Sequence, residues 1–306
     1  MQLKYGGGGR IRTCEAEAAD LQSAGFDRSP TPPYLSLILL LQMKDVNQKK
    51  LNKKIIKSFF KDSSFSNTKV IIFKELDSTN QYLMDLEIQN TDRLICAAEK
   101  QYKGRGRSNK TWESPNEENI YLSISLLTEK YINLDGFSLM VGLTIRDCLE
   151  ELYGINSKIK WPNDIYHENK KFCGILIETK PQKDKIKLVT GIGLNVFMDN
   201  NTNISQEWTS LKLINDNNVY DRNKIIGMAT LKFFENLKLF EKHGFSFFKK
   251  RFNEHNYLKN KIVKTERYNN QHCKVLEVDS SGRMKVSVDK EIKHISSGEL
   301  SLKVEE

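Results

Sequence analysis

Two arginines alternate with two glycines at residues 104–107, and Trp112 and a Ser-Pro turn at 114–115 follow them. Glycine lets a backbone approach a ligand closely, and arginine presents a rigid fork of donors that matches phosphate or carboxylate oxygens. The pattern therefore indicates a loop that binds an anion. Short basic glycine-rich loops also occur as ordinary surface turns, so the interpretation depends on which other residues converge there.

A second set of polar residues lies in the run Lys160-Trp161-Pro162-Asn163-Asp164, where a proline-bearing turn ends a strand and presents an amide and a carboxylate. After a polar hairpin, the pair Lys170-Lys171 opens the apolar run 174–178. The alternative is a surface hairpin with solvated charges. A third segment, 191–196, has the pattern of a strand with two glycines, where another backbone or a ligand can approach closely.

Other chemistries find less support in the composition. The five cysteines, at positions 14, 96, 148, 173 and 273, are odd in number and lack metal-ligand spacing, which favours free thiols in a reducing cytoplasm. The five histidines show no metal spacing either. The formal charge is +9, but lysine is spread along the chain among many Asn and Ile residues, which favours compositional bias over a nucleic-acid-binding surface.

The first 42 residues do not resemble a folding segment. Residues 6–34 combine glycine and proline clusters with little apolar periodicity, and codons for residues 11–13 can complement a transfer-RNA T-loop. We interpret residues 1–42 as a mis-called leader with Met43 as the true start; a disordered tail is the alternative. The apolar run 35–41 is far shorter than the roughly 20 residues that span a bilayer, and it lacks the cleavage site of a secretion signal.

From Met43 onward, apolar periodicity and turn residues predict the elements that must position these polar residues. Helices are predicted at 47–60, after the polar turn 77–80, at 136–152 and at 223–243, the last opened by Asp221 and closed at Gly244. Strands are predicted at 70–73, 94–98, 120–127, 158–161, 174–178, 185–189 and 191–196, and in the C-terminal part at 274–278, 284–288, near 295 and at 300–304.

Strands joined by tight turns, with the helices kept apart, predict an α+β fold and not a doubly wound sheet. A change in character near residue 258 predicts a large domain at 43–257 and a small antiparallel barrel or sandwich at 258–306. A chain of 306 residues that is 39% hydrophobic and 28% charged has room for both as a soluble globular protein.

Together, these motifs resemble those of the biotin protein ligases. The matching runs, in the family's order, are DSTN at 77–80, E-x-Q-x-x-GRGR-x4-W-x-SP at 99–115, NIYLSI at 119–124, KWPND-x-Y at 160–166, KK-x-x-GILIE at 170–178, GIGLNV at 191–196 and SGELSL at 297–302. The resemblance covers about residues 70–305. It implies a catalytic domain like that of class II aminoacyl-tRNA synthetases, with a mixed, mainly antiparallel sheet, and a small C-terminal SH3-like barrel.

The resemblance also implies a reaction in two steps. The biotin carboxylate attacks the α-phosphate of Mg-ATP to give biotinyl-5′-adenylate and pyrophosphate, and a lysine of a biotin carboxyl carrier domain, as in acetyl-CoA carboxylase, then takes the biotinyl group. The implied catalytic residues are Lys171, which would touch both carboxylate and α-phosphate, and Arg105 and Arg107, which would clamp the anions as the loop closes. Preorganised charge of this kind is most effective in a site closed off from water. No side chain needs to act as a nucleophile.

The same resemblance divides the other residues between the two substrates. Biotin would contact Ser78, Thr79, Asn80, Gln101, Arg105, Gly106, Arg107, Lys171 and Gly174. ATP or the adenylate would contact Trp112, Lys160, Asn163, Asp164 and Asn195, with Mg²⁺ held mainly by the phosphates and by Asp164. Lys170 is expected in solvent, and Cys173 is expected to serve only as a small apolar residue.

The sequence departs from the family pattern near the loop. Ser108, Asn109 and Lys110 stand where x-G-R usually follows GRGR, and Glu117 stands at the glycine of SP-x-G. Losing those glycines would stiffen the loop or change how tightly it retains the adenylate. Lys110 keeps the charge but loses the bidentate geometry of arginine.

Several alternatives stay open at this stage. A lipoate-type protein ligase would share the fold, and a non-catalytic biotin-binding regulatory module would share the site. Some members of the family repress genes through an N-terminal winged helix-turn-helix, but the roughly 25 residues between Met43 and the first catalytic strand are too few for one, so we expect no DNA partner. We expect a cytoplasmic enzyme without a membrane partner, and whether it forms a homodimer stays open. The C-terminal barrel would help to hold either ATP or the carrier.

Overall fold

The computed structural model describes residues 50–90, 92–129, 132–201, 203–264, 271–296 and 303–304. The expected leader, the start of the helix expected at 47–60 and the terminal SGELSL run lie outside the described residues. No helix in the described ranges is long and apolar enough to cross a membrane.

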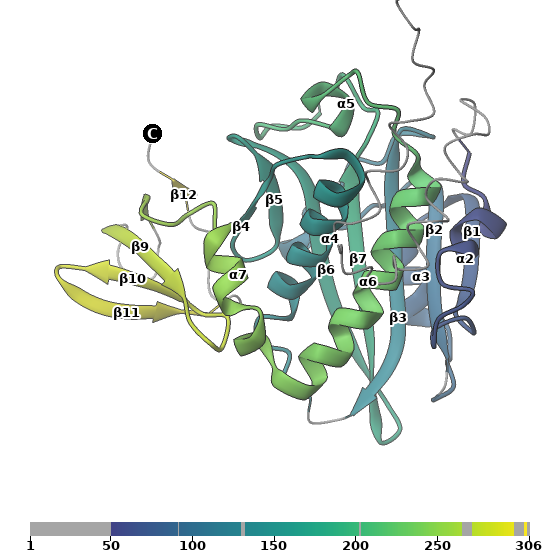
Figure 1. Cartoon of the computed structure of the whole chain (residues 1–306), viewed down its shortest axis with the longest axis horizontal. Coiled ribbons are helices and arrows are strands. Elements are labelled where there is room, and N and C mark those ends of the chain that lie inside the picture. The colour runs from purple at the N-terminus through teal and green to yellow at the C-terminus, as the bar shows by residue number, and fades with distance from the viewer. Residues whose placement is uncertain are drawn as a thin grey trace, which may run out of the picture. The chain divides into compact units, whose positions relative to one another are not determined.

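A seven-stranded sheet forms the centre of the larger part, in the order β1-β2-β3-β7-β6-β5-β4 (Figure 1). Its strands are β1 (Lys69–Leu76), β2 (Arg93–Gln101), β3 (Asn119–Glu129), β4 (Lys158–Lys160), β5 (Asp164–His167), β6 (Lys170–Gln182) and β7 (Lys185–Asn195). β1 and β2 run parallel, whereas the other neighbouring pairs of this sheet are antiparallel. The predicted α+β fold with a mixed, mainly antiparallel sheet is confirmed.

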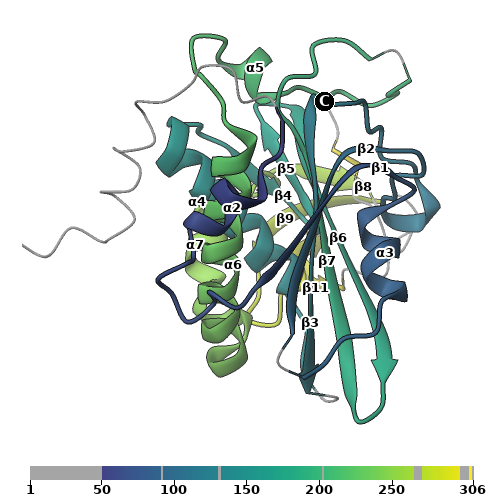
Figure 2. The same cartoon turned by 90° about the vertical axis from the view of Figure 1, so that its right-hand side faces the viewer.

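Helices cover both faces of this sheet (Figure 2). On one face lie α2 (Lys53–Ser58), α4 (Phe137–Tyr153), α6 (Arg222–His243) and α7 (Lys249–Glu254), whereas α3 (Thr79–Asp85) packs against β2, β3 and β7 on the other. The apolar stripes of α4 and α6 are buried, as in Leu149 and Phe233. The helices predicted at 136–152 and 223–243 are therefore confirmed, and Asp221 caps α6 by accepting bonds from two backbone N–H groups.

One predicted boundary is wrong. The strands predicted at 185–189 and 191–196 are one strand, β7, because it is hydrogen-bonded to β3 on one side and to β6 on the other without interruption. The polar hairpin predicted between Asp164 and Lys170 is confirmed, since β5 continues to a turn at Glu168 and pairs antiparallel with β6. Two short helices, α5 (Leu211–Ile214) and α7, were not predicted, because segments of four and six residues are too short to show a helical period.

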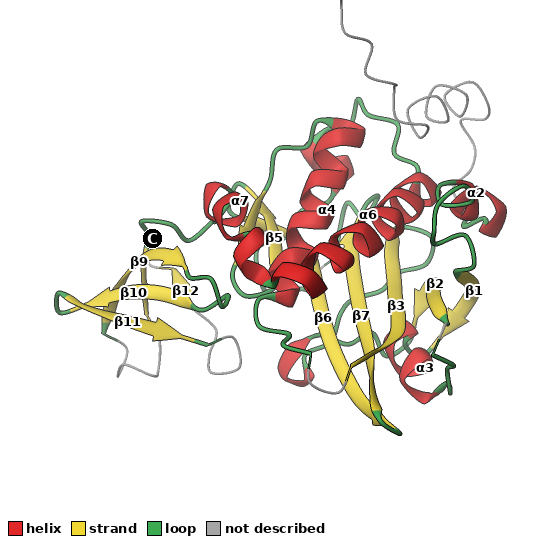
Figure 3. Cartoon of the chain, turned by 60° about the horizontal axis from the view of Figure 1, so that its bottom comes forward, coloured by secondary structure: helices red, strands yellow, loops and turns green. Residues whose placement is uncertain are grey.

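A small second sheet follows, in the order β11-β10-β9-β8-β12 (Figure 3). Its strands are β8 (Ile262–Lys264), β9 (His272–Val278), β10 (Met284–Val288), β11 (Glu291–Ile295) and β12 (Lys303–Val304), and their pairings are antiparallel. The predicted small β unit at the C-terminal end is confirmed.

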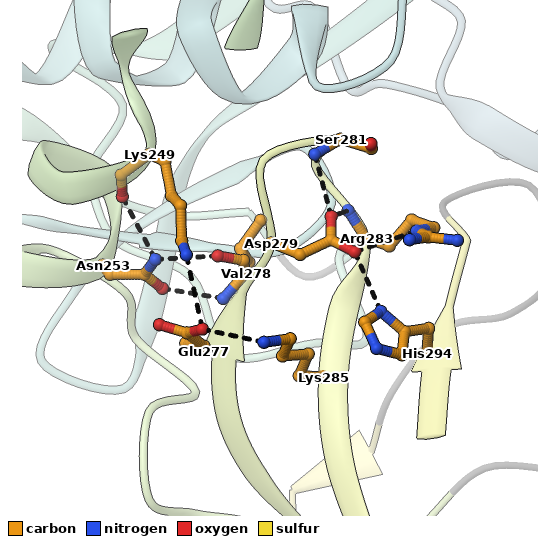
Figure 4. A network of polar contacts seen from close by, with 9 residues as sticks. All are labelled: Lys249, Asn253, Glu277, Val278, Asp279, Ser281, Arg283, Lys285 and His294. Carbon is orange, nitrogen blue, oxygen red and sulfur yellow. Dashed lines mark hydrogen bonds and ion pairs between the residues drawn. The ribbon is translucent and has the colours of Figure 1, made fainter. Parts of the chain in front are cut away.

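The turn between β9 and β10 is organised around Asp279 (Figure 4). Its Oδ1 accepts the backbone N–H groups of Ser281 and Arg283, and its Oδ2 accepts a bond from Arg283 Nε and contacts His294 Nδ1 at 2.8 Å. Burial alone would raise the pKa of Asp279, but these hydrogen bonds outweigh it and lower the pKa. The carboxylate therefore holds the turn in one shape.

The turn between β9 and β10 contacts the run 160–164, which carries several of the predicted site residues. The indole Nε1 of Trp161 donates to the carbonyl of Gly282 at 3.0 Å, and Trp161 is almost fully buried. Gly282 has φ +74°, and a Cβ on it would lie 2.5 Å from the Cα of Gly136 at the start of α4. Asn253 of α7 adds two hydrogen bonds to the backbone of Val278. The C-terminal sheet thus supports the segment that carries Asn163 and Asp164.

We predict that Gly282→Ala destabilises the protein more than Gly154→Ala does. Gly154 has φ +66°, and a Cβ added there would have nothing within 4 Å, so alanine should cost only the strain of a left-handed residue, about 1 kcal/mol. At Gly282 the backbone of Gly136 must also shift, for a total of about 2–4 kcal/mol. Urea unfolding of the two variants measures the difference, and equal losses would contradict the docking of the turn.

Candidate active site

A cavity of about 520 Å³ lies between the seven-stranded sheet and the loop at 104–112. Most of the predicted site residues line it: Ser78, Thr79, Asn80, Gln101, Arg105, Gly106, Arg107, Trp112, Lys160, Asn163, Asp164, Lys171 and Gly174. They come from the start of α3, the end of β2, the loop, the turn between β4 and β5, and β6. The antiparallel sheet brings together residues that are far apart in the sequence.

One wall of the cavity is neutral and polar. Gln101 Oε1 accepts bonds from the backbone N–H and the hydroxyl of Thr79 at 2.9 and 3.1 Å, and Gln101 Nε2 donates to Ser114 Oγ. Ser123 Oγ lies 2.7 Å from Thr79 Oγ1 and 2.5 Å from Asn80 Oδ1. Such an array suits an uncharged ligand group that both donates and accepts hydrogen bonds.

Helix α3, which carries this wall, is held at both ends. Ser78 is its N-cap and accepts a bond from the backbone N–H of Gln81. At the other end, the ammonium of Lys187 donates to the carbonyls of Met84 and Leu86 at 2.7 Å each. Burial lowers the pKa of Lys187, which is 2% exposed. A charge placed at the C-terminal end of a helix satisfies free carbonyls and complements the helix dipole.

The opposite wall is cationic. Lys171 Nζ lies 2.9 Å from Asp164 Oδ1, and both side chains are mostly buried. Burial lowers the pKa of the nearby Lys160; the charge of Asp164 opposes this shift, and the charges of Lys171 and Lys261 add to it. The positive groups therefore repel one another in the cavity, and an anion would relieve this repulsion.

The loop carrying the two arginines folds as a small hairpin. Arg105 pairs with Thr111 in an antiparallel bridge, and the N–H of Gly106 donates to the carbonyl of Lys110 at 2.7 Å. Arg107 Nη1 donates to Asn163 Oδ1 at 3.2 Å, and burial lowers the pKa of Arg107, with Asp164 opposing that effect. The loop thus reaches the turn between β4 and β5.

Trp112 lies on a surface made by two glycines. A Cβ on Gly193 would lie 2.4 Å from the indole Cε2, and a Cβ on Gly174 would lie 2.9 Å from Cζ3. Lys171 Nζ is 5.4 Å from the indole ring centroid. The indole Nε1 is buried and has no hydrogen-bond partner in the described part of the chain. Only glycine leaves room for this ring against the strands.

Asn195 is placed differently from the other predicted residues. It is not among the residues that line the cavity, and its Nδ2 donates to the carbonyl of Thr209 at 3.0 Å. Its contact with an adenylate stays a prediction. The segment that contains Thr209 runs beside Lys171. The backbone N–H of Lys171 donates to the carbonyl of Glu207, and the carbonyl of Lys171 accepts a bond from the N–H of Thr209. Gln206 of this segment lines the cavity, although no sequence pattern marked it.

Two further polar residues were missed. Glu178 accepts bonds from Arg105 Nη2 and Asn80 Nδ2, and Ser123 contacts Thr79 and Asn80. The alternation of strand side chains was the available signal. It places Glu178 on the same face of β6 as Gly174, and Ser123 on the same face of β3 as the cavity residue Tyr121.

Magnesium could be held only in part by protein side chains. No cluster of three or more His, Cys, Asp or Glu residues that could hold a metal occurs among the residues that the structure describes. Of the described residues that line the cavity, Asp164 alone is acidic, and its Oδ1 contacts Lys171. Mg²⁺ commonly binds through one or two carboxylates together with substrate phosphates. The side chains present therefore fit a Mg²⁺ ion that is held mainly by substrate phosphates. They do not fit an ion that is coordinated by protein ligands alone.

At the two positions near the loop where this sequence replaces a glycine of the family pattern, the backbone has the left-handed conformation that glycine adopts easily. Asn109 and Glu117, at the two positions where the family pattern has glycine, both have φ +59°, and Ser108 has φ +53°. Asparagine tolerates the left-handed region, whereas glutamate adopts it at a cost. The loop therefore retains its path with added strain.

Comparisons with known proteins agree with this geometry. Residues 72–195 match the Biotin/lipoate A/B protein ligase family. The bifunctional ligase/repressor BirA of Escherichia coli is 32% identical over 241 residues, covering 76% of this chain and 74% of that protein. BirA of Bacillus subtilis is 27% identical over 234 residues, covering 74% and 72%. The structure of a biotin protein ligase from Aquifex aeolicus in complex with biotin and ATP has a TM-score of 0.67 at 31% identity, covering 78% of this chain and 99% of that chain.

The fold and the site define an enzyme of the ligase class, with a neutral and a cationic wall in one cavity. The chain belongs to the Biotin/lipoate A/B protein ligase family, and within it to the biotin protein ligases. The resemblance inferred from the motifs is confirmed. Biotin ligation is accordingly its class of reaction.

We predict that Glu117→Gly stabilises the protein by about 0.5–1 kcal/mol. Glycine removes the strain of the left-handed conformation, which stabilises the folded state. The higher entropy of the unfolded chain offsets part of this gain. The matched control is Glu118→Gly, whose φ is not positive and which should lose about 0.5–1 kcal/mol. Thermal or urea unfolding compares the two, and a loss of stability in both variants would rule out strain at Glu117.

Proposed function

We propose that this enzyme activates biotin with ATP as biotinyl-5′-adenylate and transfers the biotinyl group to a lysine of a biotin carboxyl carrier domain. The observation that carries the proposal is the charge of the cavity lining. Among the described residues that line the cavity, five are cations, namely Arg105, Arg107, Lys110, Lys160 and Lys171, and one, Asp164, is a carboxylate. The Aquifex aeolicus relative, solved with biotin and ATP, supports the same pair of substrates.

The neutral wall would hold the ureido head of biotin through Thr79, Asn80 and Gln101. In the first step, a carboxylate oxygen of biotin forms a bond to the α-phosphorus, and the bond from that phosphorus to the bridging oxygen breaks, which releases pyrophosphate. Both reacting groups are anions, so their approach requires fixed positive charge. Lys171 supplies it, and the contact with Asp164 keeps its ammonium in place.

ATP would lie along the cationic wall. Trp112 would pack against the adenine, and Lys160, Asn163 and Arg107 would hold phosphate oxygens. Mg²⁺, entering with ATP, would neutralise phosphate charge, and Asp164 is the carboxylate available to it.

In the second step, the amine of the carrier lysine attacks the acyl carbon of the adenylate. The bond between that carbon and the phosphate oxygen breaks, AMP leaves, and the amine loses a proton. The attacking groups belong to the substrates, so the protein only binds, orients and excludes water. The four described cysteines are buried, which is compatible with the reducing cytoplasm that we propose as the location.

We predict that Lys171→Ala lowers the rate of biotin transfer by about a hundredfold or more, because it removes charge stabilisation from the adenylation transition state. ATP-dependent labelling of a carrier domain with biotin measures this rate. The control is Lys170→Ala, since Lys170 is the exposed neighbour on the same strand and should leave the rate unchanged. Equal rates for the Lys171 variant and the wild type would remove Lys171 from its role.

We also predict selectivity for biotin over lipoate, because lipoate lacks a polar head to pair with Thr79, Asn80 and Gln101. Pyrophosphate release, measured with Mg-ATP and each acid in turn, should be fast with biotin only. Comparable release with lipoate would assign the site to a lipoate-type ligase. Biotin binding without any release of pyrophosphate would instead favour a regulatory biotin-binding module.

A further inference from the structure

Glu178 connects the neutral wall of the cavity with the loop at 104–112. It lies on β6, and its Oε2 accepts a bond from Asn80 Nδ2 at 2.8 Å and one from Arg105 Nη2 at 2.6 Å. Asn80 belongs to the neutral wall and Arg105 to the loop. One carboxylate oxygen is therefore shared by two side chains to which biotin binding was assigned.

The contact between Glu178 and Arg105 is incomplete. It uses one carboxylate oxygen and one guanidinium nitrogen, although arginine and carboxylate can form two parallel hydrogen bonds. Arg105 Nε is buried and has no hydrogen-bond partner within the described ranges. An anion that reached Nε and Nη2 together would make the bidentate contact that Glu178 does not make.

The pair is also accessible enough to exchange. The side chains of Arg105 and Glu178 are 35% and 26% exposed, and ion pairs in contact with solvent contribute little net stability. Glu178 would keep its bond to Asn80 after losing Arg105. Releasing Arg105 therefore does not leave the carboxylate without a partner.

We propose that Glu178 is a resident carboxylate that occupies Arg105 in the free enzyme and is displaced from it by the carboxylate of the substrate. Glu178 is thus a positioning residue that holds the arginine over the site but competes with the acid for it. This inference rests on the proposed function, in which the acid is biotin. It assigns Glu178 two separable effects, one on Asn80 and one on Arg105.

The effect on Asn80 concerns the head of the ligand and not its carboxylate. Asn80 Oδ1 faces Ser123 Oγ, and a Cβ on Gly191 would lie 2.4 Å from that oxygen. The amide is therefore confined on one side, and Glu178 holds its Nδ2 on the other. Removing the Glu178 charge disturbs Asn80 equally for every ligand that carries the biotin head.

A ratio of affinities separates the two effects. Dissociation constants are measured for biotin and for biotinol, in which a primary alcohol replaces the carboxylate, with the wild type and with Glu178→Gln. The change at Asn80 alters both dissociation constants by the same factor, because biotin and biotinol carry the same head. It therefore cancels when the dissociation constant of biotinol is divided by that of biotin. Because the competing charge is gone, this ratio should rise about fivefold in Glu178→Gln, the scale of a partly exposed ion pair. An unchanged or smaller ratio would overturn the proposal.

Two further variants complete the test. Glu129→Gln makes the same change in net charge at the exposed pair with Lys185, so it should leave the ratio as in the wild type. Glu178→Ala also removes the carboxylate and should raise the ratio as Glu178→Gln does; if it does not, exchange is excluded. Failure of the proposed function is distinguishable from failure of this inference: a wild type that bound neither biotin nor biotinol, or that bound biotin without releasing pyrophosphate from Mg-ATP, would contradict the function whatever the ratio of the two dissociation constants.

Discussion

The concentration of positive charge in one partly buried cavity is the constraint on which the site depends. Burial lowers the pKa of both Lys160 and Arg107, so the protein holds these groups close together at a cost. The carboxylate of Asp164 offsets part of this cost for both groups, and Glu178 pairs with the neighbouring Arg105. Anions that enter the cavity would relieve the remaining repulsion, which is the feature on which the proposed activation of an acid by ATP depends.

Such a cluster requires support from outside the cavity. Lys171 is held on a strand whose backbone pairs both with the sheet and with the segment at 206–209. The turn that carries Asp164 rests on Trp161, whose indole is bonded to Gly282 in the C-terminal sheet. The C-terminal sheet therefore helps to position Asn163 and Asp164, even though these residues belong to the larger sheet.

The segment at 104–117 shows how residues can depart from a family pattern while the backbone keeps the conformation that the pattern favours. Asn109 and Glu117 keep the positive φ that glycine adopts easily. The hairpin bridge at Arg105 and the packing of Trp112 on Gly193 hold the loop against the sheet. At Glu117, the fold thus holds a left-handed backbone that glutamate disfavours.

The sequence by itself determined the elements whose signals are local: the periodic helices, the alternating strands, the cap at Asp221 and the order of the motifs. The identity of most cavity residues followed from that order. Only the tertiary structure decided that 185–195 is one strand, that Lys187 caps α3, that Asn195 bonds to the carbonyl of Thr209 and that Glu178 joins Asn80 to Arg105. The reason is physical: periodicity reports which face of an element is buried, whereas the partner of a polar group is set by packing between elements distant in the chain.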